Sequence, residues 1–527
     1  MKDLCVATLI AIVLGGCSRF AYYNLPADPS QPATRRATFN IQDDRGEKDV
    51  LVLLALSGGG SRSAYFSSAV MLRLQQVFPD LDLLQEVDVI SAVSGGSLPA
   101  AYYAISRDHT IRIDGGLPPG LRAHPKLHYD PATRVLSLTD TLTPMEVGTV
   151  RAAFTDLHDL HRFERLVRQQ TVASNRIWDT KTVKALMGRN YIGRWVGNWF
   201  WPENILRYWF TAYDRSDIMA QTFADNLYDV RYTGRDLTFN NINPERPYLI
   251  LNATNATEKV APDDPAFGAL FTFTDEDFRT KANSDISSYL VSRGVATSSA
   301  FPGLFNSMTL RNYLGHRKQY LHLFDGGNAD NLGLTSLKRI ILDVRVNPPQ
   351  RYRKIVVVLV DAFVRSKGMS RDRADGRCPF FCYVADLNAV DAVASLLGAN
   401  RAGVLQDFTD QLNVKRDCDL SHLPPEICDS PTLLSQISDV KSKLFFYHVR
   451  FEDSQLTGLI ENIPTRFRLT NDQTGQSNAV HLDTAAMELI NDQNACLQRI
   501  RRIVRGEETD ADVRSGIYCT FHPGGGP

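Results

Sequence analysis

Hydrophobic residues lie in short uninterrupted runs that alternate with helical patterns. Residues 49–56 are apolar after the first aspartate, as expected of a strand buried on both faces of a parallel sheet. A helical pattern over 64–78 follows, then a second strand at 87–93 and a helix over roughly 97–106. This alternation predicts an α/β sandwich with a mostly parallel central sheet.

The same pattern returns farther along the chain. The predicted elements are strands at 247–252, 320–324, 354–361 and 444–451, and helices at 385–412 and near 482–505. Residues 108–245 interrupt the alternation and hold all five tryptophans, between Trp178 and Trp209, among arginines and lysines. Two interpretations stay open: a helical insertion with an aromatic core, or a lid or membrane-facing surface, because indole rings favour the bilayer interface.

The N-terminus has the features of a targeting signal. An apolar run over 4–14 is too short to span a bilayer as a helix but suits a signal peptide. The sequence Leu14-Gly15-Gly16-Cys17 then resembles a bacterial lipobox, in which the cysteine receives a lipid. Ser18 is not the aspartate that marks inner-membrane retention, so the expected location is the bacterial cell envelope, at the outer membrane facing the periplasm. The alternative is a plain signal peptide with an incidental cysteine.

These features predict four parts of the chain. They are a signal peptide at 1–16, a polar tether at 17–47, a catalytic domain at 48–364 with the insertion at about 108–245, and a C-terminal extension at 365–527.

Overall composition excludes several classes of protein. The chain has 527 residues, of which 43% are hydrophobic and 22% charged, so it is not mainly disordered. Its net charge of -1 argues against nucleic-acid binding.

Six cysteines follow residue 365, and an oxidising periplasm would favour disulfides in the extension. Short loops suggest the pairs Cys378–Cys382, Cys418–Cys428 and Cys496–Cys519, although six cysteines allow fifteen pairings. A zinc site is the weaker alternative, because the cysteines and histidines lack finger spacing.

A glycine-rich turn follows the first strand, with the sequence Ser57-Gly58-Gly59-Gly60-Ser61-Arg62. It matches neither a Walker A loop nor a dinucleotide fingerprint. Exposed N–H groups at the start of a helix suit an anion. We therefore expect an oxyanion hole made by Gly58, Gly59 and Gly60, with Arg62 as a nearby cation.

The second turn, Ala92-Val93-Ser94-Gly95-Gly96, resembles a nucleophile elbow in which alanine replaces the first glycine. Ser57 fits the degenerate pattern too, but Ser94 leads into the better helix start and is the preferred nucleophile. A general base must accompany it. His322 and His481 are expected to be structural, and Asp325, at the end of the 320–324 strand, is preferred over Asp114.

Together, in this order, a Gly-Gly-Gly-x-Arg turn, a serine elbow and a late Asp-Gly-Gly resemble the patatin-like phospholipase family. Residues 296–303 and 462–465 add to the resemblance, which covers roughly 48–364 and more weakly 440–505. The family implies a three-layer α/β/α sandwich. Ala92 and Ser63 depart from its pattern, and neither change removes a reacting group.

The resemblance also implies a Ser–Asp dyad without histidine. Ser94 would be the nucleophile and Asp325 the base, acting on fatty-acyl esters of phospholipids, with no cofactor and no metal. A free aspartate is a poor base at neutral pH, so the dyad requires a shielded site. Alternatives are a lysophospholipase, thioesterase or general esterase on the same residues, or a catalytically weak binding or assembly protein of the outer membrane.

Overall fold

A computed structural model describes most of the chain. The described residues are 21–28, 50–228, 236–259, 267–302, 305–315, 319–346, 354–364, 388–410, 444–460, 463, 469–472, 474–508 and 517–523. The signal peptide, Cys17 and the first two suggested cysteine pairs lie outside these residues.

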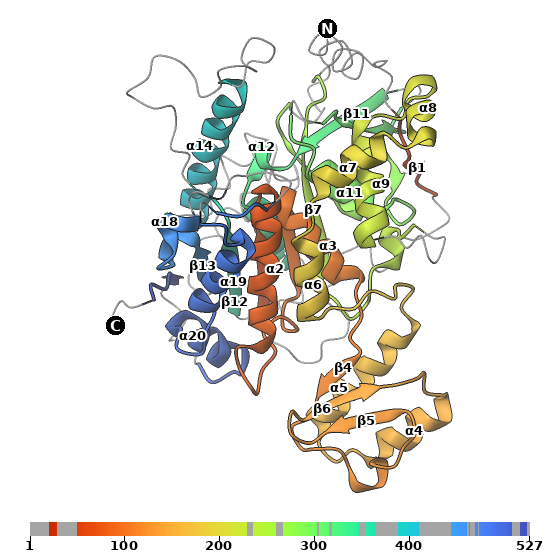
Figure 1. Ribbon diagram of the computed structural model, residues 1–527, viewed down its shortest axis with the longest axis vertical. Helices are drawn as coiled ribbons and strands as arrows, with labels where there is room; N and C mark the ends of the chain where they lie inside the picture. The colour runs from red at the N-terminus through yellow and green to blue at the C-terminus, as the bar shows by residue number, and fades with distance from the viewer. Residues whose placement is uncertain are drawn as a thin grey trace.

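A nine-stranded sheet forms the centre of the molecule (Figure 1). Its parallel part runs in the order β7 (Tyr248–Asn255), β3 (Val89–Val93), β2 (Val50–Leu56), β12 (Lys354–Asp361), β13 (Leu444–Arg450) and β14 (Ile517–Cys519). At the other edge, β8 (Leu270–Phe273), β11 (Gln319–Asp325) and β10 (Met308–Asn312) are antiparallel. The C-terminal extension therefore contributes two strands to the central sheet.

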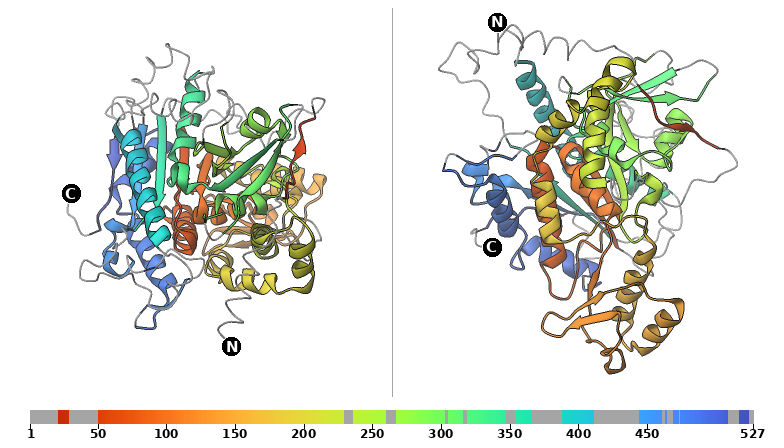
Figure 2. Two further views of the ribbon diagram at one scale, coloured as in Figure 1. Left: turned by 90° about the horizontal axis from the view of Figure 1, so that it is seen from above. Right: turned by 45° about the vertical axis from the view of Figure 1, so that its right-hand side comes forward.

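Helices cover both faces of this sheet (Figure 2). Strand β2 is buried along its whole length, and its side chains alternate between two cores. Val52, Leu54 and Leu56 pack against α2 (Gly60–Gln76), α3 (Ser97–Ile105) and α19 (Asn478–Leu489). Leu51, Leu53 and Ala55 face α13 (Leu334–Val346) and α14 (Asn388–Asp410). Two buried faces explain the continuous apolar run, and the predicted three-layer α/β/α fold is confirmed.

The insertion has two parts. Its first part was not foreseen: β4 (Thr110–Arg112), β6 (Val135–Leu138) and β5 (Leu127–Asp130) form a small antiparallel sheet that packs with α4 (Pro144–Ala153) and α5 (Leu157–Arg168) around a separate core. Figure 1 shows this subdomain projecting from one end of the molecule. The second part is helical, with α6 (Thr180–Met187), α7 (Tyr191–Trp199), α8 (Pro202–Phe210) and α9 (Arg215–Phe223).

Two other expectations need correction. The pattern near 482–505 is two helices, α19 and α20 (Ala495–Val504), because Asn494 caps the second one through its side chain. The tether is not loose throughout: residues 21–28 lie on the domain, where β1 (Leu25–Pro26) pairs with β9 (Ser284–Asp285).

A disulfide joins Cys496 to Cys519, as the short-loop pairing suggested, and so links α20 to β14. Within the described ranges, no helix is both long and apolar enough to cross a membrane.

Candidate active site

Ser94 stands at a strained turn between β3 and α3. Its φ of 50° lies in the left-handed region, which costs free energy for a residue with a side chain. The turn is held from outside by α11 (Val291–Ser298) and the residue after it. The Ser94 N–H donates to Ser298 Oγ at 3.1 Å, and Ser299 Oγ donates to the Ser94 carbonyl at 3.0 Å. These serines belong to the 296–303 segment, whose contacts with Ser94 were not predicted.

The two glycine turns lie against each other. A Cβ added to Gly95 would lie 2.1 Å from the Gly60 carbonyl oxygen, and one added to Gly96 would lie 2.7 Å from that of Leu56. Neither position can hold a side chain without moving backbone. The close approach therefore places Ser94 beside the turn that follows β2.

Asp325 reaches the serine from an antiparallel strand. Strand β11 pairs with β7 in the opposite direction, so that Asp325 lies opposite Ala253. The expectation that Asp325 ends a parallel strand was wrong. Strand β11 begins beyond the carboxyl ends of the parallel strands and runs back to the level of Ser94. The exposure of its side chains alternates along the strand. Such alternation is typical of an antiparallel strand.

Asp325 and Ser94 form a hydrogen bond. Ser94 Oγ donates to Asp325 Oδ2 at 2.7 Å, and the Gly327 N–H donates to Oδ1 at 2.8 Å. Burial raises the pKa of Asp325 to about 6, although both hydrogen bonds oppose that rise. The carboxyl is thus shielded from water, and its raised pKa makes its ionised form a stronger base than a free aspartate.

The first glycine turn offers fewer donors than expected. The Gly58 N–H donates to the Asn331 carbonyl at 2.9 Å, so it is not free to bind an oxyanion as expected. Gly59 and Gly60 have φ of 144° and 60°, and Gly60 begins α2. The first N–H groups of a helix lack intrahelical partners and carry partial positive charge. Gly59 and Gly60 therefore stay candidates for an oxyanion hole.

Arg62 is fully buried and holds backbone. Its Nε donates to the Ala362 carbonyl at 3.0 Å and its Nη1 to the Ile463 carbonyl at 2.6 Å, and burial lowers its pKa to about 10. Among the described residues, both hydrogen-bond acceptors of Arg62 are backbone carbonyls: one lies just after β12, and the other lies in the 462–465 segment. These contacts assign Arg62 a positioning role in place of the expected oxyanion cation. Ile463 comes from the 462–465 segment, whose other residues lie outside the described ones.

The competing residues have other partners. Ser57 Oγ is buried and accepts from the Ala362 N–H at 2.8 Å. Asp114 pairs with Arg162 at 2.7 Å in the small subdomain. His322 contacts Thr309 at 3.1 Å, and His481 contacts Asp472 at 2.8 Å.

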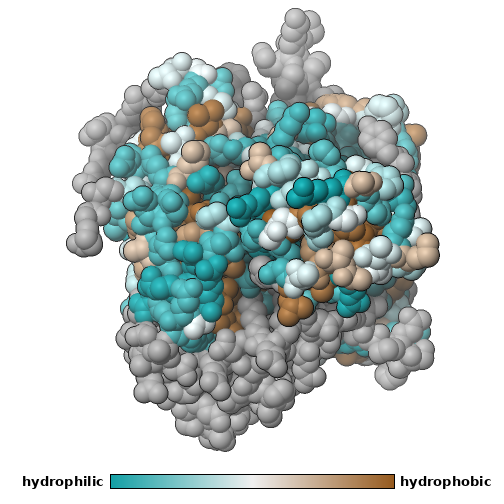
Figure 3. All heavy atoms as spheres, turned by 90° about the horizontal axis from the view of Figure 1, so that it is seen from below, coloured by the Kyte–Doolittle hydropathy of each residue, from teal (hydrophilic) through white to brown (hydrophobic). Residues whose placement is uncertain are grey.

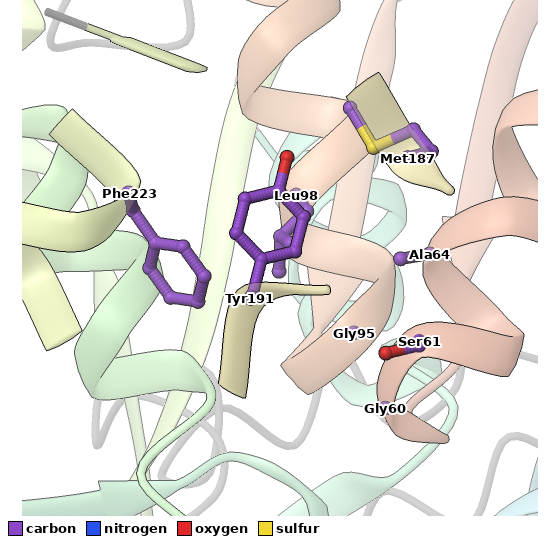
Figure 4. A pocket seen from close by; sticks show the side chains of 8 residues that line it. All are labelled: Gly60, Ser61, Ala64, Gly95, Leu98, Met187, Tyr191 and Phe223. Carbon is purple, nitrogen blue, oxygen red and sulfur yellow. The ribbon is translucent and has the colours of Figure 1, made fainter. Parts of the chain in front are cut away.

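A small apolar cavity adjoins both glycine turns (Figure 4). Gly60, Ser61 and Gly95 line it on the side of the two turns, together with Ala64 and Leu98. The insertion supplies the remaining wall, where the rings of Tyr191 and Phe223 and the Met187 thioether lie across from the turns. The helical part of the insertion therefore encloses space beside the serine.

The family model for patatin-like phospholipases matches residues 54–114, which include the first glycine turn and Ser94. Over these residues the chain is similar to patatin-like phospholipases. The resemblance drawn from the motifs is thereby confirmed, and a search of curated proteins finds no match.

Among solved structures, the chain is similar to VipD from Legionella pneumophila (14% identity, TM-score 0.23) over 61% of this chain and 51% of that one. It is also similar to human GIVD cytosolic phospholipase A2 (12% identity, TM-score 0.30), over 60% of this chain and 44% of that one. A third similar structure is the ExoU–SpcU complex of Pseudomonas aeruginosa (15% identity, TM-score 0.19), over 69% of this chain and 52% of that one. The chain thus spans about half the length of each.

The buried Asp325 carboxyl should make the fold less stable at high pH. Its pKa is above the ordinary 3.8, so protonation favours folding, and this contribution is lost as pH rises towards 6 and beyond. We expect Asp325→Asn to be more stable than wild type by about 1 to 3 kcal/mol at pH 8, with the difference vanishing near pH 4. Denaturant unfolding at both pH values, with Asp114→Asn as control, measures this. A difference that is equal at the two pH values would contradict the shielded carboxyl.

Proposed function

We propose that this protein is a serine acyl hydrolase that cleaves fatty-acyl esters of phospholipids with Ser94 and Asp325. The observation that carries the proposal is the 2.7 Å hydrogen bond from the strained serine to a buried carboxylate. The family match supports lipid acyl hydrolysis.

In the proposed reaction, Ser94 Oγ forms a bond to the ester carbonyl carbon while its proton passes to Asp325 Oδ2. The N–H groups of Gly59 and Gly60 stabilise the oxyanion of the tetrahedral intermediate. The ester C–O bond then breaks, and the leaving alcohol takes the proton from Asp325. Water next attacks the acyl-serine while Asp325 accepts a proton from it. The bond between the acyl carbon and Ser94 Oγ then breaks, Oγ takes the proton back from Asp325, and the fatty acid departs. A pKa of about 6 suits a base that works near neutral pH.

The dyad is tested by substitution. Ser94→Ala and Asp325→Asn should each remove nearly all turnover, by at least a thousandfold, and the double variant should lose little more because the two residues act as one unit. Hydrolysis of a panel of phospholipids, lysophospholipids, thioesters and short-chain esters is the measurement, and it also separates the alternative substrates. Asp114→Asn, which lies in the small subdomain, is the control. Full turnover in Asp325→Asn with loss in His322→Ala would restore a histidine base.

We propose further that Cys17 is lipidated and that the protein is anchored in the bacterial cell envelope, at the outer membrane facing the periplasm. The supporting observation is the apolar run over 4–14 that ends in Leu14-Gly15-Gly16-Cys17. Intact-mass analysis should show loss of residues 1–16 and an added diacylglycerol. An unmodified Cys17 in a fully soluble protein would contradict the anchor.

A further inference from the structure

The two helices α7 and α8 present an apolar outer surface. Seven large hydrophobic side chains are exposed there, and we call them the α7–α8 face: Val196, Phe200, Trp201, Ile205, Leu206, Trp209 and Phe210. Phe210 is 81% exposed and Trp201 60%. Isolated exposed hydrophobic residues are ordinary, but seven within fifteen consecutive residues form a patch that marks an interaction site.

The inner side of the same helices belongs to the domain. Tyr191, Trp195 and Tyr208 lie in the main core, and Tyr191 also lines the cavity beside Gly60. The tryptophans thus fit both interpretations of the sequence, an aromatic core and an exposed, membrane-facing surface. Trp178 and Trp195 are buried and Trp199 packs on the core, whereas the rings of Trp201 and Trp209 are exposed.

The N-terminal segment is fixed next to α9, the helix that packs against α7. The Asn24 side chain donates to the Arg311 carbonyl at 2.8 Å, and the Tyr23 ring lies 3.3 Å beneath the guanidinium of Arg293. Arg293 pairs with Asp217 in α9 at 2.5 Å. Residues 21–28 are therefore held against β10, α11 and, through Arg293, α9.

This docking limits where a lipid on Cys17 could reach. Three residues separate Cys17 from residue 21, and the four Cα–Cα steps between them cover at most about 15 Å in an extended chain. A lipid on Cys17 would therefore attach close to docked residues 21–28, which lie against Arg293 and so beside α9.

The charge of the face also favours one partner. Residues 191–210 contain two arginines and one glutamate, and Glu203 is paired with Arg207 at 2.5 Å, which leaves Arg194 exposed. Indole rings, aliphatic side chains and a net positive charge are the chemistry of a bilayer interface. At the opposite end of the molecule, hydrophilic residues predominate (Figure 3).

We propose that the α7–α8 face lies on a phospholipid bilayer, and that docked residues 21–28 hold the protein in this orientation. The orientation brings the helices that enclose the cavity next to the lipid from which the substrate would come. The inference deepens the proposed lipid hydrolysis, but its first test requires no turnover.

Tryptophan fluorescence on vesicles of brominated phosphatidylcholine tests the contact in the full protein. Bromine quenches rings at the interface, so wild type should be quenched, and Trp201→Phe with Trp209→Phe should lose most of the quenching. Trp178→Phe, a buried control, should keep it. Absence of quenching in wild type, or equal quenching in the double variant, would overturn the proposal whether or not the protein hydrolyses lipid.

A second experiment measures the consequence for turnover. Trp201→Ala with Phe210→Ala should lower hydrolysis of vesicle phospholipid about tenfold, while hydrolysis of a dissolved short-chain ester and the Tm change little. The matched control is Met145→Ala with Leu157→Ala, which removes two side chains that are 81% and 70% exposed in the small subdomain. Equal loss on both substrates with a lower Tm would return the face to the core. A changed oligomeric state with unchanged vesicle turnover would make it an interface between copies of this chain.

Discussion

Burial of one carboxyl group beside one serine is the constraint on which the rest of the site depends. A buried carboxylate is costly unless it is hydrogen-bonded, and Asp325 has only Ser94 Oγ and the Gly327 N–H as side-chain partners among the described residues. The cost raises the pKa to about 6 and so converts a weak base into a useful one. Burial of this carboxylate therefore destabilises the fold at the position where the proposed chemistry needs a base. The packing of the surrounding helices and sheet must offset that cost.

Two sets of contacts keep that pair in place. On one side, the backbone of Gly95 lies so close to that of Gly60 that a side chain at position 95 would push the serine turn away from the proposed oxyanion turn. On the other side, Ser298 and Ser299 bind the backbone of Ser94 and hold its strained conformation. Arg62 then fixes the first turn of α2 to the ends of two other segments. Precise placement comes from backbone contacts between distant parts of the chain, and the side chains that react are few.

Much of the fold could be predicted from the sequence because local patterns determined it. The continuous apolar run of β2 indicated a buried parallel strand, and the ordered motifs selected Ser94 and Asp325 correctly as neighbours. What was missed depends on tertiary contacts. The alternating exposure of β11 could have revealed an antiparallel strand, but nothing local shows that Asn331 occupies the Gly58 N–H or that Arg62 binds carbonyls. The docking of residues 21–28 likewise depends on partners more than 250 residues away.

The measurement that tests the central claim most directly is the pH dependence of serine labelling by a fluorophosphonate, followed by peptide mapping of the adduct. The account predicts a single modified residue, Ser94, with a labelling rate that falls as pH decreases through about 6 because Asp325 becomes protonated. It also predicts that labelling is nearly abolished in Asp325→Asn at every pH. An adduct on Ser57, or a labelling rate at Ser94 that is independent both of pH and of Asp325, would contradict the account.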